Sequence, residues 1–329
     1  MKRRTLIGSV GSMASVWPLQ THGQQSRSLR PSLRLGVVEG GFVSLPMSAL
    51  YQRLAELGFV EGQNLLVHRD FSLVFMEYLE RAYADVVKSG VDVLLALGEE
   101  PMLKAARRAA DGRVPVVFIA MDYDPMQSGY VASLPKPGGN LTGLFVRQPD
   151  LAVKRLQIAR DALPKAKRVA LVWNAELARD QYQASAAAAA SLGFDLRGVE
   201  AGRDSFTVDQ VMRQTMAMGA DAIVLSSSGD YYIQRAGLAQ AALEARLPLI
   251  AFAREFVEVG ALISYGINID SVWRRAADYV ARIATGTHPS DLPVEQPTRF
   301  ELSVNSRTAA ALGLTLTPAL LGRADEIID

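Results

Sequence analysis

Cysteine is absent from the sequence, and histidine occurs only three times in 329 residues. Without a thiol, the chain can form no disulfide, thiolate-bound zinc or iron–sulfur centre, cysteine nucleophile or lipid-modified cysteine anchor. His22 lies near the N-terminus, and neither His68 nor His288 stands in a recognisable motif. We therefore expect neither a metal site nor a cofactor.

A charge excess of one sign is also lacking, because 35 Lys and Arg balance 34 Asp and Glu to give a formal charge of +1. Proteins that track nucleic-acid phosphates carry a clear basic excess, so we expect no nucleic-acid partner. No stretch beyond the N-terminus reaches the length of a membrane span, since the apolar run 184–192 is alanine-rich and too short. With 49% hydrophobic and 21% charged residues, the chain is globular and long enough for two domains.

The common catalytic motifs are missing too. There is no Gly-x-Ser-x-Gly nucleophile motif, no glycine-rich dinucleotide motif after the first predicted strand, and no phosphate-binding loop ending in Gly-Lys-Ser or Gly-Lys-Thr. No nucleophile and base stand together in a recognisable pattern. We therefore predict that the protein is not an enzyme and has no catalytic residues.

The first residues are typical of an export signal. Lys2, Arg3 and Arg4 form a basic start, and the mildly apolar stretch 6–19 follows. The paired arginines indicate the twin-arginine route. We expect a signal peptide over 1–23, cleavage near Gly23, and a periplasmic protein without a lipid anchor. The alternative is a frayed terminus with no targeting role.

Short β-rich runs alternate with helical patterns along the rest of the chain, which is typical of βαβ units and parallel sheets. We predict an α/β fold of two doubly wound, Rossmann-like parallel-sheet lobes. In the first half, the predicted strands are 33–38, 65–69, 91–97 and 114–120, and the predicted helices are 46–57, 77–88 and 102–110. In the second half, the strands are 169–173, 195–199, 222–226 and 249–252, and the helices are 181–192, 208–218 and 232–245.

The second half of the chain repeats the first in register, at spacings of 129 to 135 residues. Chance can supply one such match, but three in order indicate two similarly built open sheets. The matching segments are 57–59 with 192–194, Asp92 with Asp221, and Pro115 with Pro248.

Ligands bind open α/β sheets outside the carboxyl ends of the strands, so candidate ligand-binding residues can be taken from those ends. The first lobe offers mostly carboxylates, and the second offers hydroxyls, an amide, a carboxylate and an arginine. The first-lobe candidates are Glu39, Gly40, Gly98, Glu99, Glu100, Asp122, Tyr123 and Asp124. The second-lobe candidates are Asn174, Ser228, Asp230, Tyr231 and Arg254.

Some of these candidates could have a structural role in place of ligand binding. Glu99 and Glu100 either face the ligand or cap the helix that follows, because carboxylates are favourable in a first helical turn. Arg254 either binds a ligand carboxylate or pairs with Glu255 or Glu258.

The two sets of strand ends predict a small ligand with an aromatic or otherwise planar part. The acidic ends of the first lobe would attract an amine and repel a carboxylate, which would turn toward Arg254 and Ser228. Of two adjacent tyrosines we favour Tyr231 as the ligand contact, since Tyr232 is placed to begin a helix and pack.

Several segments in order, from about residue 33 to the C-terminus, carry a family resemblance. They are 58–64 (GFVEGQN), 133–143 (SLPKPGGNLTG), 254–258 (REFVE) with 264–266 (SYG), 291–302 (DLPVEQPTRFEL), 309–314 (AAALGL) and 323–326 (RADE). Together they resemble the ABC transporter substrate-binding proteins that include the tryptophan- and tyrosine-binding periplasmic proteins. The resemblance implies a type I periplasmic-binding-protein fold, in which two lobes joined by crossover segments close on a small ligand.

The resemblance also implies where the chain crosses between the lobes, namely near residues 147, 264 and 289. The first lobe would then comprise 31–147 with about 264–288, including a helix over 272–285. The second lobe would comprise 148–263 with about 289–329.

The function that the resemblance implies is solute capture for an ABC importer, with a small-molecule ligand and an inner-membrane permease as partners and a monomeric chain. The alternative is a periplasmic ligand-sensing protein that signals to a membrane receptor through the same closing lobes. Fold alone does not choose between them. Neighbouring genes for a permease and an ATPase would favour import.

Overall fold

The computed structural model describes residues 32–40, 47–73, 78–121, 123–202 and 206–329. The predicted signal peptide 1–23 and the candidate residue Asp122 lie outside the described residues. Of Glu39 and Gly40, only the backbone is described.

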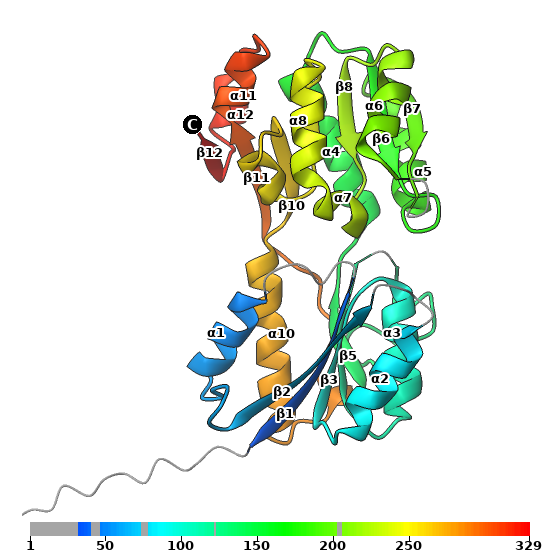
Figure 1. Ribbon diagram of the computed structural model, residues 1–329, viewed down its shortest axis with the longest axis vertical. Coiled ribbons are helices and arrows are strands. Elements are labelled where there is room, and N and C mark those ends of the chain that lie inside the picture. The colour runs from blue at the N-terminus through cyan, green and yellow to red at the C-terminus, as the bar shows by residue number, and fades with distance from the viewer. Residues whose placement is uncertain (1–31, 41–46, 74–77, 122, 203–205) are drawn as a thin grey trace, which may run out of the picture. The chain divides into compact units, whose positions relative to one another are not determined.

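A five-stranded parallel sheet forms the core of the first lobe (Figure 1). Its strands are β1 (Leu33–Gly40), β2 (Leu65–Leu73), β3 (Val93–Gly98), β4 (Val116–Ala120) and β5 (Leu141–Phe145). They lie in the order β2-β1-β3-β4-β5. β3 and β4 are buried along their whole length, as expected for continuous apolar runs inside a parallel sheet.

A seven-stranded sheet forms the core of the second lobe. Its strands are β6 (Arg168–Trp173), β7 (Asp195–Glu200), β8 (Ala222–Leu225), β9 (Leu249–Ala251), β10 (Ile263–Ile267), β11 (Phe300–Asn305) and β12 (Glu326–Ile328). The parallel order β7-β6-β8-β9-β10 repeats that of the first lobe. β11 runs antiparallel to β10, and β12 runs parallel to β11.

Helices cover both faces of each sheet (Figure 1). They are α1 (Ser48–Glu56), α2 (Leu79–Lys88), α3 (Glu100–Ala110), α4 (Gln148–Ala162), α5 (Arg179–Ala189), α6 (Val208–Ala217), α7 (Gly229–Ile233), α8 (Arg235–Glu244), α9 (Arg254–Glu258), α10 (Ile269–Ala284), α11 (Ser306–Ala311) and α12 (Pro318–Leu321), with a 3-10 helix at Pro289–Asp291. In the first lobe, α1 packs against α10 on one face and α2 packs against α3 on the other. In the second lobe, α4 packs against α5, and α6 packs against α8. The predicted α/β fold of two doubly wound lobes is confirmed.

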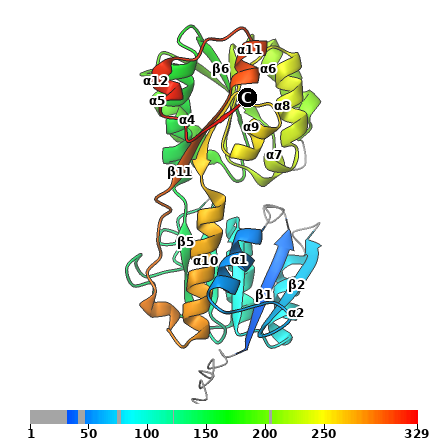
Figure 2. The same cartoon turned by 90° about the vertical axis from the view of Figure 1, so that its left-hand side faces the viewer.

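The chain passes between the lobes where β5 leads into α4, where β10 leads into α10, and where residues 296–299 lead into β11 (Figure 2). The second of these crossings follows residue 264, because Ser264 pairs with Ser303 inside the second sheet. The third follows residue 289, because the segment 289–295 is held by the first lobe. There the Thr142 hydroxyl donates a hydrogen bond to the Leu292 carbonyl (2.7 Å).

Candidate functional site

The turn between β3 and α3 holds three predicted site residues. Gly98 ends β3 with a φ of +100°, and its carbonyl accepts a hydrogen bond from the Met121 N–H (3.1 Å). Glu99 precedes α3 as its N-cap residue and is only 7% exposed, but its carboxylate makes no capping hydrogen bond. Glu100 accepts a hydrogen bond from the Tyr130 hydroxyl (3.1 Å), and burial together with the Glu100 charge raises the pKa of Tyr130 to about 12. The Glu100 carboxylate is therefore engaged within the first lobe.

The loop after β4 holds two further candidates. Tyr123 is half-buried and packs edge-to-face on Tyr130, with the ring centroids 6.0 Å apart. Asp124 braces the loop, since its Oδ1 accepts hydrogen bonds from the N–H groups of Met126 (2.9 Å) and Gln127 (3.1 Å). Asp124 thus has a structural role that the sequence did not predict.

In the second lobe, Asn174 organises the turn after β6. The side chain is fully buried, and its Oδ1 accepts hydrogen bonds from the N–H groups of Glu176 (2.9 Å) and Leu177 (3.3 Å). Within the described part of the chain, the Asn174 Nδ2 and the buried Ser228 hydroxyl have no hydrogen-bond partner. Asp230 follows in the first turn of α7. The ends of β6 and β8 therefore each carry a buried polar atom, Asn174 Nδ2 and the Ser228 hydroxyl, that no described residue bonds.

Tyr231, predicted as a ligand contact, packs in the core, whereas Tyr232 packs as predicted and also lines a pocket. Tyr231 is fully buried, its hydroxyl donates to the Ala201 carbonyl (2.8 Å), and its ring lies 5.1 Å from that of Phe206. Burial raises the pKa of Tyr231. Because α7 begins at Gly229, Tyr232 does not begin the helix. Its side chain is only 4% exposed, packs edge-to-face on Phe256 with the ring centroids 6.2 Å apart, and also lines a pocket.

Arg254 forms the ion pair that was the alternative to ligand binding. The side chain is 47% exposed, with its guanidinium 3.0 Å from the Glu258 carboxylate and 3.6 Å from that of Glu326. Such exposed pairs contribute little stability. Arg254 also lines a pocket, so the pairing leaves a contact with ligand open.

Two pockets lie at these strand ends and share Met121 and Gln148. Of the predicted site residues, Arg254 lines the first pocket, and Tyr123 and Asp124 line the second. The first pocket is lined by Met121, Gln148, Leu151, Ser227, Tyr232, Phe252, Ala253, Arg254, Glu255, Gly266, Ile267, Asn268, Ile269, Asp270 and Glu301. The second is lined by Met121, Tyr123, Asp124, Gln127, Phe145, Val146, Arg147, Gln148, Pro149, Leu177, Asp180 and Gln181.

A buried polar network lies beside the first pocket. Arg155 of α4 is fully buried, and its guanidinium donates to the carbonyls of Leu225 (2.9 Å) and Tyr265 (3.2 Å). The guanidinium also donates to Gln148 Oε1 (3.3 Å) and Ser227 Oγ (3.0 Å). The Ser227 hydroxyl in turn donates to Gln148 Oε1 (2.8 Å). The network therefore ties the start of α4 to the carboxyl end of β8.

Gln181 of α5 fixes the backbone of Ser227 in the same network. Its Oε1 accepts a hydrogen bond from the Ser227 N–H (2.8 Å), and its Nε2 donates to the Ser227 carbonyl (3.3 Å). A buried hydrogen-bond network of this kind rigidifies the groups that it joins. The pocket wall formed by Ser227 is therefore held in one geometry.

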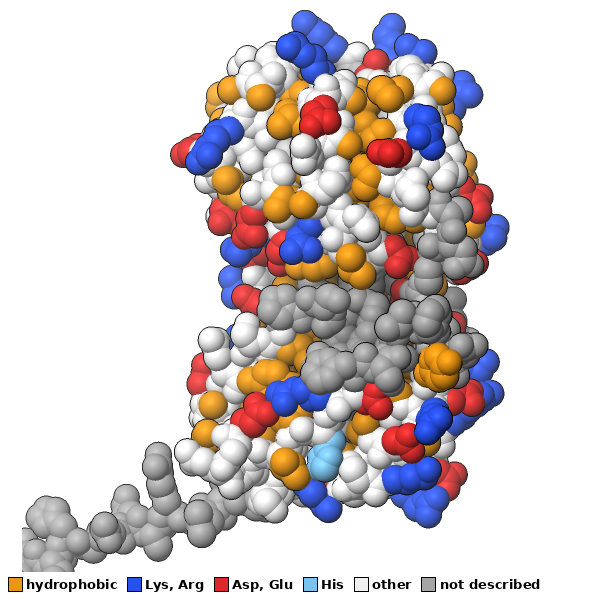
Figure 3. All heavy atoms as spheres, viewed as in Figure 1, with side chains coloured by type: hydrophobic (Ala, Val, Ile, Leu, Met, Phe, Trp, Pro, Cys, Tyr) orange, Lys and Arg blue, Asp and Glu red, His pale blue; other side chains and the backbone are white. Residues whose placement is uncertain are grey.

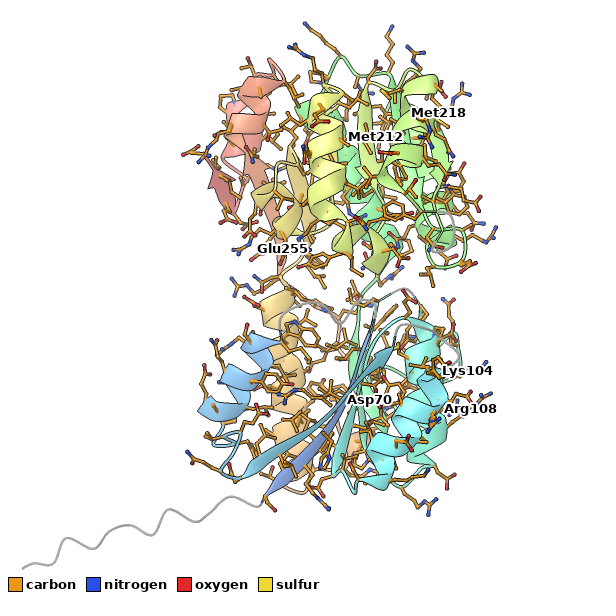
Figure 4. The ribbon with its side chains drawn as sticks, in the orientation of Figure 1. Asp70, Lys104, Arg108, Met212, Met218 and Glu255 are labelled. Atoms are coloured by element: carbon orange, nitrogen blue, oxygen red, sulfur yellow. The ribbon has the colours of Figure 1, made fainter. Side chains whose placement is uncertain are left out.

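Carboxylates outnumber cations in the first pocket, where Glu255, Asp270 and Glu301 stand against Arg254. Burial raises the pKa of Glu255, and the nearby Glu258 carboxylate raises it further. Figure 4 shows Glu255 at the end of the second lobe from which β10 leads into α10. This charge balance favours a ligand with an amine or other hydrogen-bond donors.

Sequence reasoning missed Gln148, Arg155 and Gln181, because it took candidates only from the ends of recognised strands. A signal for Gln148 was present, since Pro149 and Asp150 are typical of a first helical turn and so mark the start of α4. Arg155 stands seven residues after Gln148 and therefore lies on the same helical face. Neither residue type alone indicated a contact with the end of β8.

On the face drawn in Figure 3, Lys and Arg side chains are interspersed with Asp and Glu on both lobes. Within the described ranges, no three His, Asp or Glu side chains gather in a way that could hold a metal ion. No helix in those ranges combines the length and the apolar character needed to cross a membrane.

Comparison with known proteins places the chain among ligand-binding relatives. The family model described as ABC transporter substrate binding protein matches residues 36–328. A curated relative, the tyrosine-binding protein of Clostridioides difficile (strain R20291), is 23% identical over 306 residues. The aligned region covers 92% of this chain and 86% of that relative.

Two solved structures have a similar fold. A conserved domain protein from Vibrio cholerae has a TM-score of 0.79 and 26% sequence identity, with 90% of this chain and 99% of that chain covered. An ABC domain from Streptococcus pneumonia, in complex with L-Trp, has a TM-score of 0.79 and 20% identity, with coverage of 90% and 100%.

Proposed function

Because the chain belongs to the family of ABC transporter substrate-binding proteins, we propose that it captures a small ligand in the periplasm and delivers it to the permease of an ABC importer. The family predicted from the sequence is thereby confirmed. The observation that carries the proposal is the position of the two pockets, at the carboxyl ends of the strands and beside a segment that joins the lobes. A ligand held there can shift an equilibrium between open and closed lobes, which is a binding role and not a catalytic one.

The ligand that we propose is an aromatic amino acid or a closely related aromatic amine. The rings of Tyr232 and Phe252 offer aromatic contact in the first pocket. The carboxylates of that pocket favour an ammonium group, whereas Glu100, from which an amine contact was expected, already binds Tyr130. The named tyrosine-binding relative and the L-Trp complex support this class of ligand.

Thermal unfolding and calorimetry with defined probes test the ligand class. L-tryptophan, L-tyrosine and L-phenylalanine should raise the unfolding midpoint in proportion to RT ln(1 + [L]/Kd), whereas L-leucine at the same concentration should not. Binding of L-leucine as tight as that of the aromatic amino acids, or no shift with any of them, would contradict the proposed ligand.

The proposed function includes export of the chain to the periplasm and delivery of the ligand to a permease. A mature chain that begins near Gln24 should be found in the periplasmic extract by N-terminal sequencing, and it should behave as a monomer in size-exclusion chromatography. An intact Met1 in that extract would contradict removal of a signal peptide. Co-purification with a transporter permease supports import, whereas co-purification with a membrane receptor supports the sensing alternative.

A further inference from the structure

We infer that Gln148 is a specificity-determining residue of the first pocket and that Arg155 positions it so that the amide nitrogen faces a hydrogen-bond acceptor of the ligand. The inference rests on the proposed function and adds the chemical group that is recognised. That group is a carboxylate or a carbonyl oxygen.

The orientation of the Gln148 amide follows from its neighbours. A glutamine amide has an acceptor end, Oε1, and a donor end, Nε2, and the surrounding hydrogen bonds decide which way it points. The Arg155 guanidinium carries only donors, and its Nη2 lies 3.3 Å from Gln148 Oε1. The Ser227 hydroxyl donates to the same oxygen at 2.8 Å. The reverse orientation would set N–H groups against the guanidinium, so Oε1 faces Arg155.

Ser227 has no donor group left with which to bind an acceptor of the ligand. Its hydroxyl hydrogen is used on Gln148, and its hydroxyl oxygen accepts from Arg155 (3.0 Å). Its backbone N–H and carbonyl are both paired with the amide of Gln181. The donor that remains at this wall of the pocket is therefore not a serine hydroxyl.

Gln148 Nε2 is the donor that remains. The side chain is only 4% exposed, yet it lines both pockets, and its Nε2 donates no hydrogen bond to any residue that the structure describes. A donor left unpaired when a ligand excludes water is unfavourable, so a ligand that offers an acceptor at this point is selected over one that does not.

The charge of Arg155 adds to this selection. The guanidinium is fully buried beside Gln148, so it contributes a positive potential at the end of the pocket where Nε2 lies. The carboxylates Glu255, Asp270 and Glu301 line the same pocket. An amino-acid ligand would thus place its carboxylate toward Gln148 and its ammonium toward the acidic side chains.

The variant Gln148→Glu tests the inference because it keeps the oxygen that faces Arg155 and replaces Nε2 with a second oxygen. Without ligand, its unfolding midpoint should equal or exceed that of the parent protein. Its affinity for L-tryptophan should fall about tenfold or more. Its affinity for tryptamine, which lacks the carboxylate, should fall much less. The control is Gln52→Glu, which makes the same charge change on the exposed face of α1 and should alter neither affinity.

The role of Arg155 is measured by the ratio of the L-tryptophan and tryptamine affinities, because a general loss of stability affects both ligands alike. The variant Arg155→Met should move this ratio toward one by freeing the amide to rotate. If that variant does not fold, Ser227→Ala removes one of the two donors to Oε1 and should move the ratio in the same direction. An unchanged ratio in the folded variant would overturn the positioning role.

Failure of the inference and failure of the proposed function can be told apart. A midpoint of ligand-free Gln148→Glu that falls by several degrees would show that Nε2 is bonded inside the lobe, and it would overturn the inference whatever the protein binds. An unchanged preference for L-tryptophan over tryptamine in that variant would also overturn it. A parent protein that binds no aromatic amino acid would instead contradict the proposed function.

Discussion

The Glu255 carboxyl is the group that we expect to make ligand binding depend on pH. Burial raises its pKa, Glu258 on the same helix raises it further, and the cations Arg254 and Arg235 oppose the shift. A bound ammonium group favours the ionised carboxylate. Binding of an amine ligand should therefore release a proton, and affinity should rise with pH through the raised pKa of Glu255 and then level off.

Calorimetry of tryptamine in two buffers of different ionisation enthalpy measures that proton release. Glu255→Gln should abolish both the release and the pH dependence, whereas Glu258→Gln, a change at an exposed position, should retain most of both. Because the folded-state pKa lies above the unfolded one, the ligand-free protein should gain stability as pH falls through it. A pH-independent affinity in the parent protein would contradict the assignment of Glu255.

The strands β5 and β10 each contain a glycine that lies directly against the backbone of the neighbouring chain segment. These two strands lead into two of the crossings between the lobes. A Cβ on Gly143 would lie 2.0 Å from the Phe118 carbonyl oxygen, and one on Gly266 would lie 1.8 Å from that of Phe252. We expect Gly143→Ala and Gly266→Ala each to lower the free energy of unfolding by at least about 2 kcal/mol, because the strands must separate.

Gly237 on α8 is the matched control for these two substitutions. An added Cβ there would meet its nearest neighbour at 3.4 Å, and alanine favours a helix by up to about 1 kcal/mol over glycine. Chemical denaturation should therefore show Gly237→Ala as neutral or more stable. Equal midpoints for Gly266→Ala and the parent protein would show that the two strands are not constrained at this point.

The elements that could be predicted from the sequence are those whose residues recur in both lobes. The Asp92 carboxylate accepts a hydrogen bond from the Arg34 N–H at the start of β1 (2.8 Å). The Asp221 carboxylate accepts one from the Arg168 N–H at the start of β6 (2.8 Å). Asp92 and Asp221 thus stand just before the equivalent strands β3 and β8 and bond the starts of their equivalent neighbours, which explains why the repeat predicted two similarly built sheets.

The third crossing and the C-terminal strands could not be placed in the same way. β11 pairs antiparallel with β10, which lies more than thirty residues earlier in the chain, and the repeat contains no copy of that pairing. Its position depends on contacts such as that of Thr142 with Leu292, which join distant segments. The sequence resemblance implied only that the chain crosses near residue 289.

The candidate site was predictable as a region and not as a set of side chains. Strand ends predicted Arg254 and Tyr123, which do line pockets. The choice between Tyr231 and Tyr232 depended on the residue at which α7 begins, and one position along a helix turns a side chain by 100°. The place of Gln148 in the site depends on contacts between α4 and the end of β8, which no local sequence pattern encodes.

The complete molecule should respond to ligand by hinge closure, and the absence of cysteine makes this response measurable. Two introduced cysteines are the only sites that a thiol-directed spin label can modify. Leu66 on β2 and Met216 on α6 are 55% and 54% exposed and lie in different lobes, so both positions accept a label without disturbing the core. Met216 and Ile327 form a control pair within the second lobe.

Pulsed electron spin resonance on the pair Leu66→Cys and Met216→Cys should show one distance population without ligand and a second with saturating L-tryptophan. The control pair Met216→Cys and Ile327→Cys should not change, because closure moves whole lobes. To convert most molecules, the ligand must bind the closed form on the order of a hundredfold more tightly than the open form, or more. At an L-tryptophan concentration close to the Kd of the parent protein, adding Gln148→Glu should leave most molecules in the first population. Identical distances with and without a ligand that calorimetry shows to be bound would mean that capture occurs without closure.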